Sequence, residues 1–364
     1  MARPLRLTLW IVAAALLAAT LPSAAQGASC TLSERLDPRL KGTAKKGLVT
    51  ASTGRRLGRF LCVRRKPARS RFFAPTSFWN TPLTTRARLD ARSKVWVGEL
   101  RRQLAGTNPW INTTSYSTPL YTVPRHQPRV KVAVDPRAGS RNAWVSPSLT
   151  RQFAAVPIPA GARPAPGSDG HMVIWQPSTD TMWEFWVARR RDDGWHAIWG
   201  GQMTDVSRNP GHFTDGFGAT ATGLPLAGGL ITIDELRRGR IDHALALAIP
   251  HTQIWHRFAA PAQRSDGDID SPNAIPEGAR LRLDPRLDID ALGLPRTTRV
   301  VAKAIQKYGM IVRDKSGAVS LYAEDPARTG RNPYPGIFGM HPDRLFDRFP
   351  WHRLQVIKTE MRRP

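Results

Sequence analysis

The chain has few cysteines and few acidic side chains, and both shortages narrow what it can be. Two thiols among 364 residues exclude a four-cysteine zinc module and a disulfide-dense scaffold. Asp and Glu number 28 against 54 Lys and Arg, so the formal net charge is +26. A charge of this size favours anionic partners. No aromatic-interleaved recognition motif accompanies it, and we therefore expect no nucleic-acid binding.

Several catalytic signatures are also absent. The sequence has no GxSxG nucleophile elbow, no GxxxxGKS/T phosphate loop and no GxGxxG dinucleotide fingerprint. It also lacks the HExxH spacing of a zinc-binding helix. These absences argue against a serine hydrolase with that elbow, a P-loop enzyme and a dehydrogenase.

Long apolar runs are scarce, and the most apolar one lies near the start of the sequence. The run 7–21 is shorter than the roughly 20 residues that span a bilayer. Arg3 and Arg6 precede it and small residues follow at 23–25, which is the order of a secretory signal peptide. We therefore expect residues 1–25 to be removed, and the protein to be secreted or cell-wall associated without a membrane span.

The predicted export determines the oxidation state that we expect for the two cysteines. Cys30 and Cys62 both follow the predicted cleavage site, so we expect one disulfide bond between them in an oxidising space. Acylation of Cys30 as a lipoprotein is the alternative. Between Thr31 and Arg71 there are thirteen Lys or Arg and two acidic residues. Residues 26–72 are thus predicted to form a basic arm or small disulfide-closed module that attaches to an anionic polymer.

The rest of the chain, residues 73–364, is rich in turn residues and short strand patterns. The segments MVIW, MWEFWVA and WHAIWGG follow one another with turn residues between them, which predicts an antiparallel meander. Two short helices are predicted, one entered at Thr232 and one that ends at Gly309. The expected fold is mainly β, an antiparallel β-sandwich or jelly-roll-like core with a few short helices, in one main domain and as a monomer.

Strand alternation places one carboxylate in apolar surroundings. In the strand predicted around residues 181–187, Met182, Glu184 and Trp186 share one face. A carboxylate between two large apolar side chains needs either a partner or a raised pKa. Glu184 is therefore a candidate general acid, and burial against an arginine is the equal alternative.

The same region supplies the other candidates. His243 is the polar member of an apolar row in IDHALALAI, where a hydrogen-bonded core histidine is the more common outcome. The candidate catalytic residues are Glu184, Asp169, His171, His196, Glu235 and His243. The candidate substrate-binding residues, which would stack on sugar rings, are Trp186, Trp195 and Trp199.

Several blocks of the chain together carry a family resemblance. They are FWNTPL, GWHAIWGG, GATATGLPLAGGL, GRIDHALALAIP, EGARLRLDPRLDID and AIQKYGMIVRD, in this order. The chain from about Phe73 to Tyr322 resembles a family of secreted bacterial proteins that share this order of blocks. The resemblance implies export and one continuous domain, and it implies no reaction. It marks as members of the shared blocks Asp169, His171, Glu184, Trp195, His196, Glu235 and His243.

Three functions fit these residues. We expect an enzyme that acts on an extracellular, anionic polysaccharide, either as a glycoside hydrolase or as a polysaccharide lyase, because carboxylates and histidines serve both reactions. A non-catalytic carbohydrate-binding or cell-wall-binding protein is the alternative. The third is a metal-dependent hydrolase with ligands among Asp169, His171, His196 and His243.

No cofactor or resident metal is expected from the sequence. The acidic loop 265–273 has the composition of a calcium loop, with Asp266, Asp268 and Asp270 as the ligands it could offer. We interpret this loop as a solvated turn in preference to a calcium site.

Overall fold

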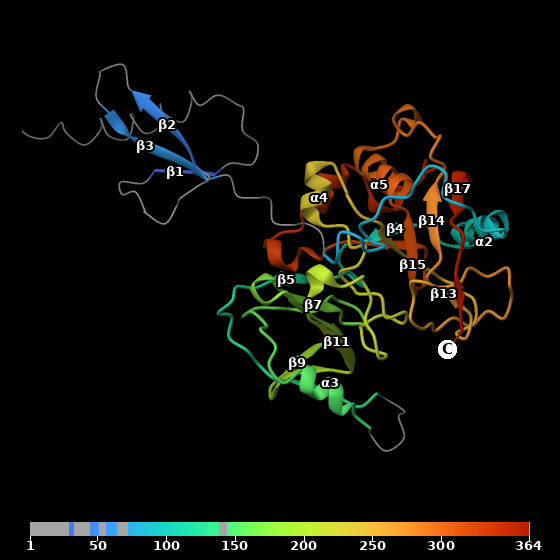
Figure 1. Cartoon of the computed structure of the whole chain (residues 1–364), viewed down its shortest axis with the longest axis horizontal. Helices are drawn as coiled ribbons and strands as arrows, with labels where there is room; N and C mark the ends of the chain where they lie inside the picture. The colour runs from blue at the N-terminus through green and yellow to red at the C-terminus, as the bar shows by residue number, and fades with distance from the viewer. Residues whose placement is uncertain (1–28, 33–43, 51–55, 64–71, 138–143, 364) are drawn as a thin grey trace, which may run out of the picture. The chain divides into compact units, whose positions relative to one another are not determined.

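The computed structural model describes residues 29–32, 44–50, 56–63, 72–137 and 144–363 (Figure 1). The chain divides into two compact units, of which one ends at Ser70 and the other runs Arg71–Pro364. The predicted signal peptide, residues 1–25, lies outside the described residues. Among those residues no helix combines the length and the apolar character needed to cross a bilayer.

The first unit contains a three-stranded antiparallel sheet in the order β1 (Ser29–Leu32), β3 (Arg56–Val63), β2 (Ala44–Thr50). The register of β1 against β3 places Cys30 directly opposite Cys62. Opposed residues of an antiparallel pair have Cα atoms about 4.5–5.5 Å apart, which is within the range that a disulfide bond spans. The backbone is therefore compatible with the predicted bond.

The largest sheet of the second unit has six strands. Their order is β17 (Leu354–Val356), β14 (Arg280–Leu283), β15 (Met310–Lys315), β12 (Leu245–Ile249), β16 (Ser320–Tyr322) and β4 (Trp110–Asn112). Strand β12 is parallel to β15, and β16 is parallel to β4. The other pairings in this sheet are antiparallel.

Three smaller sheets complete the second unit. One has the order β11 (Trp199–Met203), β8 (Thr181–Trp186), β7 (Met172–Gln176), β5 (Leu120–Thr122). The next has the order β6 (Val132–Val134), β10 (Gly194–Ala197), β9 (Arg189–Arg191), and the last pairs β13 (Phe258–Ala259) with β18 (Met361–Arg362). Short 3-10 turns lie at Pro177–Thr179, Val206–Arg208, Asp290–Leu292, Pro326–Thr329, Pro342–Arg344 and Trp351–Arg353.

The prediction of a mainly β protein with few helices is confirmed, but the prediction of purely antiparallel sheets is wrong. Four pairings are parallel, β4 with β16, β5 with β7, β6 with β10 and β12 with β15. Alternation along a strand reports which faces are buried and not which way a neighbour runs. The predicted meander is also interrupted, because β10 leaves β7 and β8 to pair with β6 and β9.

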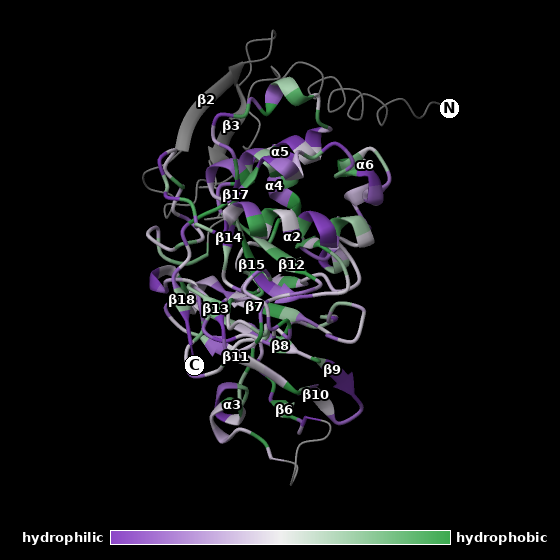
Figure 2. Cartoon of the chain, turned by 90° about the vertical axis from the view of Figure 1, so that its right-hand side faces the viewer, coloured by the Kyte–Doolittle hydropathy of each residue, from purple (hydrophilic) through white to green (hydrophobic). Residues whose placement is uncertain are grey.

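The second unit is built in layers, which Figure 2 shows from the helices at the top to the small sheet at the bottom. Helices α2 (Ser93–Gly106), α4 (Ile233–Arg238) and α5 (Arg296–Lys307) share a core cluster with one face of the six-stranded sheet. A second cluster joins the opposite face of that sheet to β5, β7, β8 and β11. A third joins β7 and β8 to the small sheet and to α3 (Pro147–Gln152).

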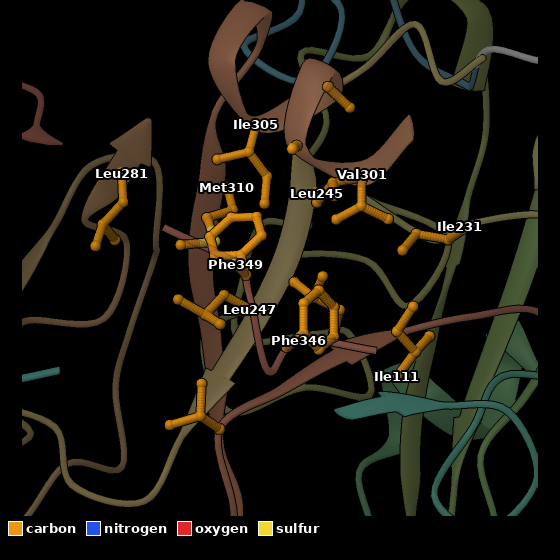
Figure 3. Packing of buried hydrophobic residues seen from close by; sticks show 14 of the residues in the cluster. Ile111, Ile231, Leu245, Leu247, Leu281, Val301, Ile305, Met310, Phe346 and Phe349 are labelled. Atoms are coloured by element: carbon orange, nitrogen blue, oxygen red, sulfur yellow. The ribbon is translucent and has the colours of Figure 1, made fainter. Parts of the chain in front are cut away.

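The strand β12 shows how sequence alternation produces these layers. Leu245, Leu247 and Ile249 enter the helix-side cluster, whereas Ala246 and Ala248 enter the middle one. Figure 3 shows Leu245 and Leu247 beneath Val301 and Ile305 of α5. The strand β8 divides in the same way, since Met182 and Trp186 pack in the middle cluster and Trp183 and Phe185 in the third. The predicted alternation of β8 is thus confirmed.

Both predicted helices are present. Helix α4 begins after Thr232, whose side chain accepts a hydrogen bond from Glu235 N, and it ends at Gly239 in the left-handed region. Helix α5 is followed by Gly309, also in the left-handed region. Helices α2, α3 and α6 (Tyr334–Phe338) are present although they were not predicted. Helix α2 lacks a side-chain N-cap, so its start carries no sequence signal.

Candidate functional site

A cleft of about 650 Å³ opens in the second unit. Its walls come from segments that are far apart in the sequence, namely 134–137, 144–146, 169–171, 198–199, 216–221, 264–266 and 314–315, together with Trp186 and Tyr322. Strands of the six-stranded sheet, of the β11-β8-β7-β5 sheet and of the β6-β10-β9 sheet, with the loops next to them, therefore border the cleft. Concave sites with several titratable groups are the default location of binding or catalysis.

Asp169 and His171, both predicted site residues, lie in this cleft. The turn that carries them is held to the end of β8, because Val187 N donates to Asp169 O at 2.6 Å and Ala188 N donates to Gly170 O at 3.0 Å. Gly170 has a φ of 45°, and a Cβ there would lie 2.9 Å from Ala188 O. Trp186 Nε1 donates to Asp169 Oδ1 at 3.4 Å. The carboxylate is thus fixed beside a tryptophan ring.

His171 is almost completely buried, with 5% of its surface exposed. Burial lowers the pKa of the imidazole to about 4, the positive charge of Arg313 lowers it further, and Asp169 opposes both. The ring is therefore neutral at neutral pH. Its Nδ1 atom has no hydrogen-bond partner among the described residues.

Tyr322, at the end of β16, lines the cleft next to this pair. The guanidinium carbon of Arg313 lies 4.0 Å from the centre of its ring. Burial, and to a lesser extent Asp314, raises the pKa of the phenol. Arg313 itself is fully buried and donates from Nη1 to Leu226 O at 2.9 Å and to Gly228 O at 3.2 Å.

A bulge in β15 places Asp314 at the cleft. Pairing with β12 shifts between Val312 and Asp314, so Arg313 is the extra residue, and such bulges redirect side chains. Burial raises the pKa of the Asp314 carboxyl to about 7, and the nearby Asp266 raises it as well. Oxygen atoms of Asp266, Glu277 and Asp314 all lie within 4.8 Å of one another. Burial and both neighbours hold the pKa of Glu277 well above its usual range.

Two tryptophans form aromatic walls. Trp186 lies under the guanidinium of Arg137, whose carbon is 5.7 Å from the ring centre. Trp199 stacks on Phe217 at 6.2 Å and donates from Nε1 to Gly216 O at 3.2 Å. Both were predicted to bind substrate, and both line the cleft. The third predicted residue, Trp195, is packed in the core beneath Arg190 and does not line it.

No family model, curated protein or solved structure matches the chain. The site is therefore interpreted from its own geometry, and the resemblance to a family of secreted bacterial proteins stays a prediction.

Glu184, the foremost candidate acid, does not line the cleft and is fully buried. Its two carboxylate oxygens accept hydrogen bonds from Ala219 N and Leu226 N, both at 2.7 Å. Burial raises the pKa of Glu184 to about 7, although these bonds and Arg313 oppose the shift. Because residues 218–221 line the cleft, Glu184 positions a wall of the site and does not contact a substrate.

The other predicted residues hold local structure outside the cleft. His196 binds Asp135 Oδ1 through Nδ1 at 2.8 Å and Asp193 Oδ1 through Nε2 at 3.0 Å, and the first of these contacts is the larger cause of its raised pKa. His243 Nε2 lies 3.1 Å from Glu235 Oε1, and Glu235 also closes the capping box of α4. The four proposed ligands Asp169, His171, His196 and His243 are thus not brought together as a metal site.

The predicted calcium ligands separate in the same way. Asp268 pairs with Lys315 Nζ at 2.9 Å and Asp270 with Arg257 Nη1 at 3.6 Å, whereas Asp266 faces Glu277 and Asp314. Sequence reasoning missed Glu277, Asp314 and Tyr322. One signal was available, since the charged pair in MIVRD interrupts an otherwise apolar strand.

Proposed function

We propose that the protein is a secreted carbohydrate-active enzyme that cleaves an anionic polysaccharide by β-elimination at a uronic acid. The observation that carries this proposal is that a neutral histidine, His171, and a tyrosine, Tyr322, line one cleft together with Trp186 and Trp199. Aromatic faces bind sugar rings, and the two titratable groups supply a base and an acid. The sharing of the middle core cluster by the two larger sheets supports a sandwich-like scaffold.

The reaction needs one proton removed and one delivered. His171, being neutral, takes the proton from C5 of the uronic acid, the electron pair forms the C4–C5 double bond, and the C4–O bond breaks. Tyr322, whose raised pKa keeps it protonated, donates its proton to the leaving oxygen. The proton then passes from His171 to the tyrosinate or exchanges with water. A bound uronate would raise the pKa of His171 and strengthen it as a base.

The charge of the molecule supports an anionic substrate. Residues 72–364 contain 39 Lys and Arg against 26 Asp and Glu. Arg137, Arg264 and Lys315 lie on the cleft wall. Arg264 is held rigidly, since it donates to Ala221 O at 2.9 Å and Thr220 O at 2.7 Å. Fixed cations of this kind stabilise charge on a carboxylate without reorganising.

Hydrolysis is a second candidate, because two carboxylates, Asp169 and Asp314, line the same cleft. Glycoside hydrolases use such a pair, one as acid and one as nucleophile or base. The products separate the two reactions. Elimination leaves an unsaturated uronate with ultraviolet absorbance, whereas hydrolysis leaves only saturated ends.

The test is incubation with uronate-containing and neutral polysaccharides, followed by ultraviolet absorbance and reducing-end assays. His171→Asn and Tyr322→Phe should each lower kcat by about 10²–10⁴-fold with an unchanged melting temperature. The control is His126→Gln, since His126 is exposed and outside the cleft. Saturated products would favour hydrolysis, and binding without any product would favour a carbohydrate-binding protein.

A further inference from the structure

The group of Asp266, Glu277 and Asp314 has no role in the reaction proposed above. The three residues come from separate segments, a loop, the turn before β14 and the bulge in β15, yet their oxygens all lie within 4.8 Å of one another. Asp266 and Asp314 line the cleft. Glu277 closes the group from behind and is fully buried.

The buried carboxylate is incompletely satisfied. Glu277 Oε2 accepts a hydrogen bond from Asp266 N at 3.2 Å, whereas Oε1 has no partner among the described residues. A buried carboxylate oxygen without a donor is unfavourable unless a cation or a proton lies next to it. Glu277 Oε1 is therefore a candidate ligand for a cation.

Two of the cations near this group, Lys315 and Arg264, bind other partners. Lys315 Nζ pairs with Asp268, and Arg264 donates to backbone oxygens of the loop 216–221. Arg313 donates from Nη1 to the backbone oxygens of Leu226 and Gly228, and its Nε and Nη2 atoms have no hydrogen-bond partner among the described residues. Within residues 72–137 and 144–363 no salt bridge reaches Asp266, Glu277 or Asp314.

Two glycines, each directly after one of the acidic residues, fix the local backbone. A Cβ on Gly267 would lie 1.8 Å from Gln253 O, and a Cβ on Gly278 would lie 1.7 Å from Ala259 O. Only glycine allows these two contacts. The backbone next to Asp266 and the backbone next to Glu277 are thus each held against the segment 253–259.

We propose that Asp266, Glu277 and Asp314 bind one divalent cation, Ca²⁺ in preference to Mg²⁺, in the wall of the cleft. All three ligands are oxygens, which hard cations prefer, and the open side toward the cleft leaves room for water or a substrate carboxylate. Ca²⁺ accepts six to eight ligands in flexible geometry, which suits an irregular group better than the octahedron of Mg²⁺.

The cation would change the charge of the cleft. Its lining has three cationic side chains and four carboxylates, Asp135, Asp169, Asp266 and Asp314. A bound divalent ion reverses that excess of negative charge and supplies a ligand position for the uronate carboxylate. This second consequence rests on the proposed function, whereas the binding of the cation does not.

The experiment uses the full chain freed of metal with a chelator. Titration calorimetry and thermal unfolding with CaCl₂ should show saturable binding and a rise in melting temperature, with a smaller effect of MgCl₂. Glu277→Gln and Asp266→Asn should each weaken Ca²⁺ binding at least 10-fold. Asp266 is exposed, so its variant tests the site even where Glu277→Gln fails to fold. The matched control is Asp270→Asn, which removes a charge in the same loop and should leave Ca²⁺ affinity unchanged.

Two results would refute the proposed cation site. One is the absence of heat and of a thermal shift up to about 10 mM Ca²⁺, above the range of extracellular calcium modules. The other is unchanged affinity in both variants. Calcium binding without polysaccharide cleavage would refute the proposed function and leave the site standing. Cleavage that is indifferent to the chelator would refute the role of the cation in substrate binding.

Discussion

At the scale of single residues, His171 links burial to the pH dependence of the proposed reaction. Its low pKa means that the base stays neutral well into the acid range. We predict that kcat/KM on a uronate polymer falls as the pH drops through about 4, because His171 then becomes protonated. A profile of kcat/KM against pH checks this. An acid limb near the ordinary pKa of histidine, about 6.5, would contradict the buried base.

The raised pKa of Glu184 makes the stability of the folded protein depend on pH. Its pKa in the folded protein is about 7, whereas the carboxyl ordinarily has a pKa of 4.5, so the folded state binds the proton more tightly. The contribution of Glu184 to stability is therefore complete below pH 4.5 and is lost as the pH rises through 7. At 1.36 kcal/mol per pKa unit this loss is about 3 kcal/mol.

We predict that Glu184→Gln removes this part of the pH dependence and also destabilises the protein by about 1–3 kcal/mol, since an amide cannot accept from both backbone N–H groups. Denaturant unfolding of the wild type and the variant from pH 4.5 to pH 8 measures both effects. Glu360→Gln, at an exposed position, is the control and should change stability little. Identical slopes against pH in wild type and Glu184→Gln would refute the assignment.

At the scale of elements, alternation and capping predict a part of the fold well. The strand β8 divides its side chains as its alternation requires, and the cap at Thr232 with the stop at Gly239 marks α4. The pairing partner of a strand, in contrast, is not predicted by the local sequence. Strand β4 pairs with β16, more than 200 residues later, and nothing local to Trp110–Asn112 specifies that neighbour. Direction and partner are properties of the assembled sheet.

The residues of the candidate site likewise fall into those with a local sequence signal and those that depend on strand pairing. Asp169, His171, Trp186 and Trp199 were predicted as site residues and line the cleft, whereas Trp195 and His196 of the same segment do not line it. The role of Glu184 stayed open in the sequence, because alternation gives the face of a strand, and that face can be a core as well as a cleft wall. Tyr322 reaches the cleft only through the pairing of β16, which the sequence does not reveal.

The register of β1 and β3 bears on the two cysteines. We predict that Cys30 and Cys62, which lie opposite each other, form a disulfide bond in the exported protein. Mass analysis under non-reducing conditions should show a loss of two hydrogens. Cys62→Ser should leave the unfolding of residues 72–363 unchanged, because the bond lies in the other compact unit. Two free thiols, or an acylated Cys30, would contradict it.

At the scale of the whole molecule, positive charge is spread over both units. Residues 1–71 contain 15 Lys and Arg against two acidic residues, in addition to the excess in the second unit. We predict that binding to a polyuronate weakens at least several-fold when salt rises from about 0.01 M to about 0.15 M, because the Debye length falls from about 30 Å to about 8 Å. Binding assays at both salt concentrations check this. Binding that ignores salt would show that charge is not the attraction.

The pairing of β4 with β16 also sets an order of events. Residues 110–112 are made early, yet their neighbours at 320–322 are made late, and Tyr322 of the cleft belongs to the late strand. Pairings of such separation close slowly, since a long loop must be ordered first. A chain that is exported while still unfolded therefore carries no finished cleft across the membrane. If the proposed export and the proposed reaction both hold, the cleft is completed only after translocation, when the last strands of the large sheet join the first.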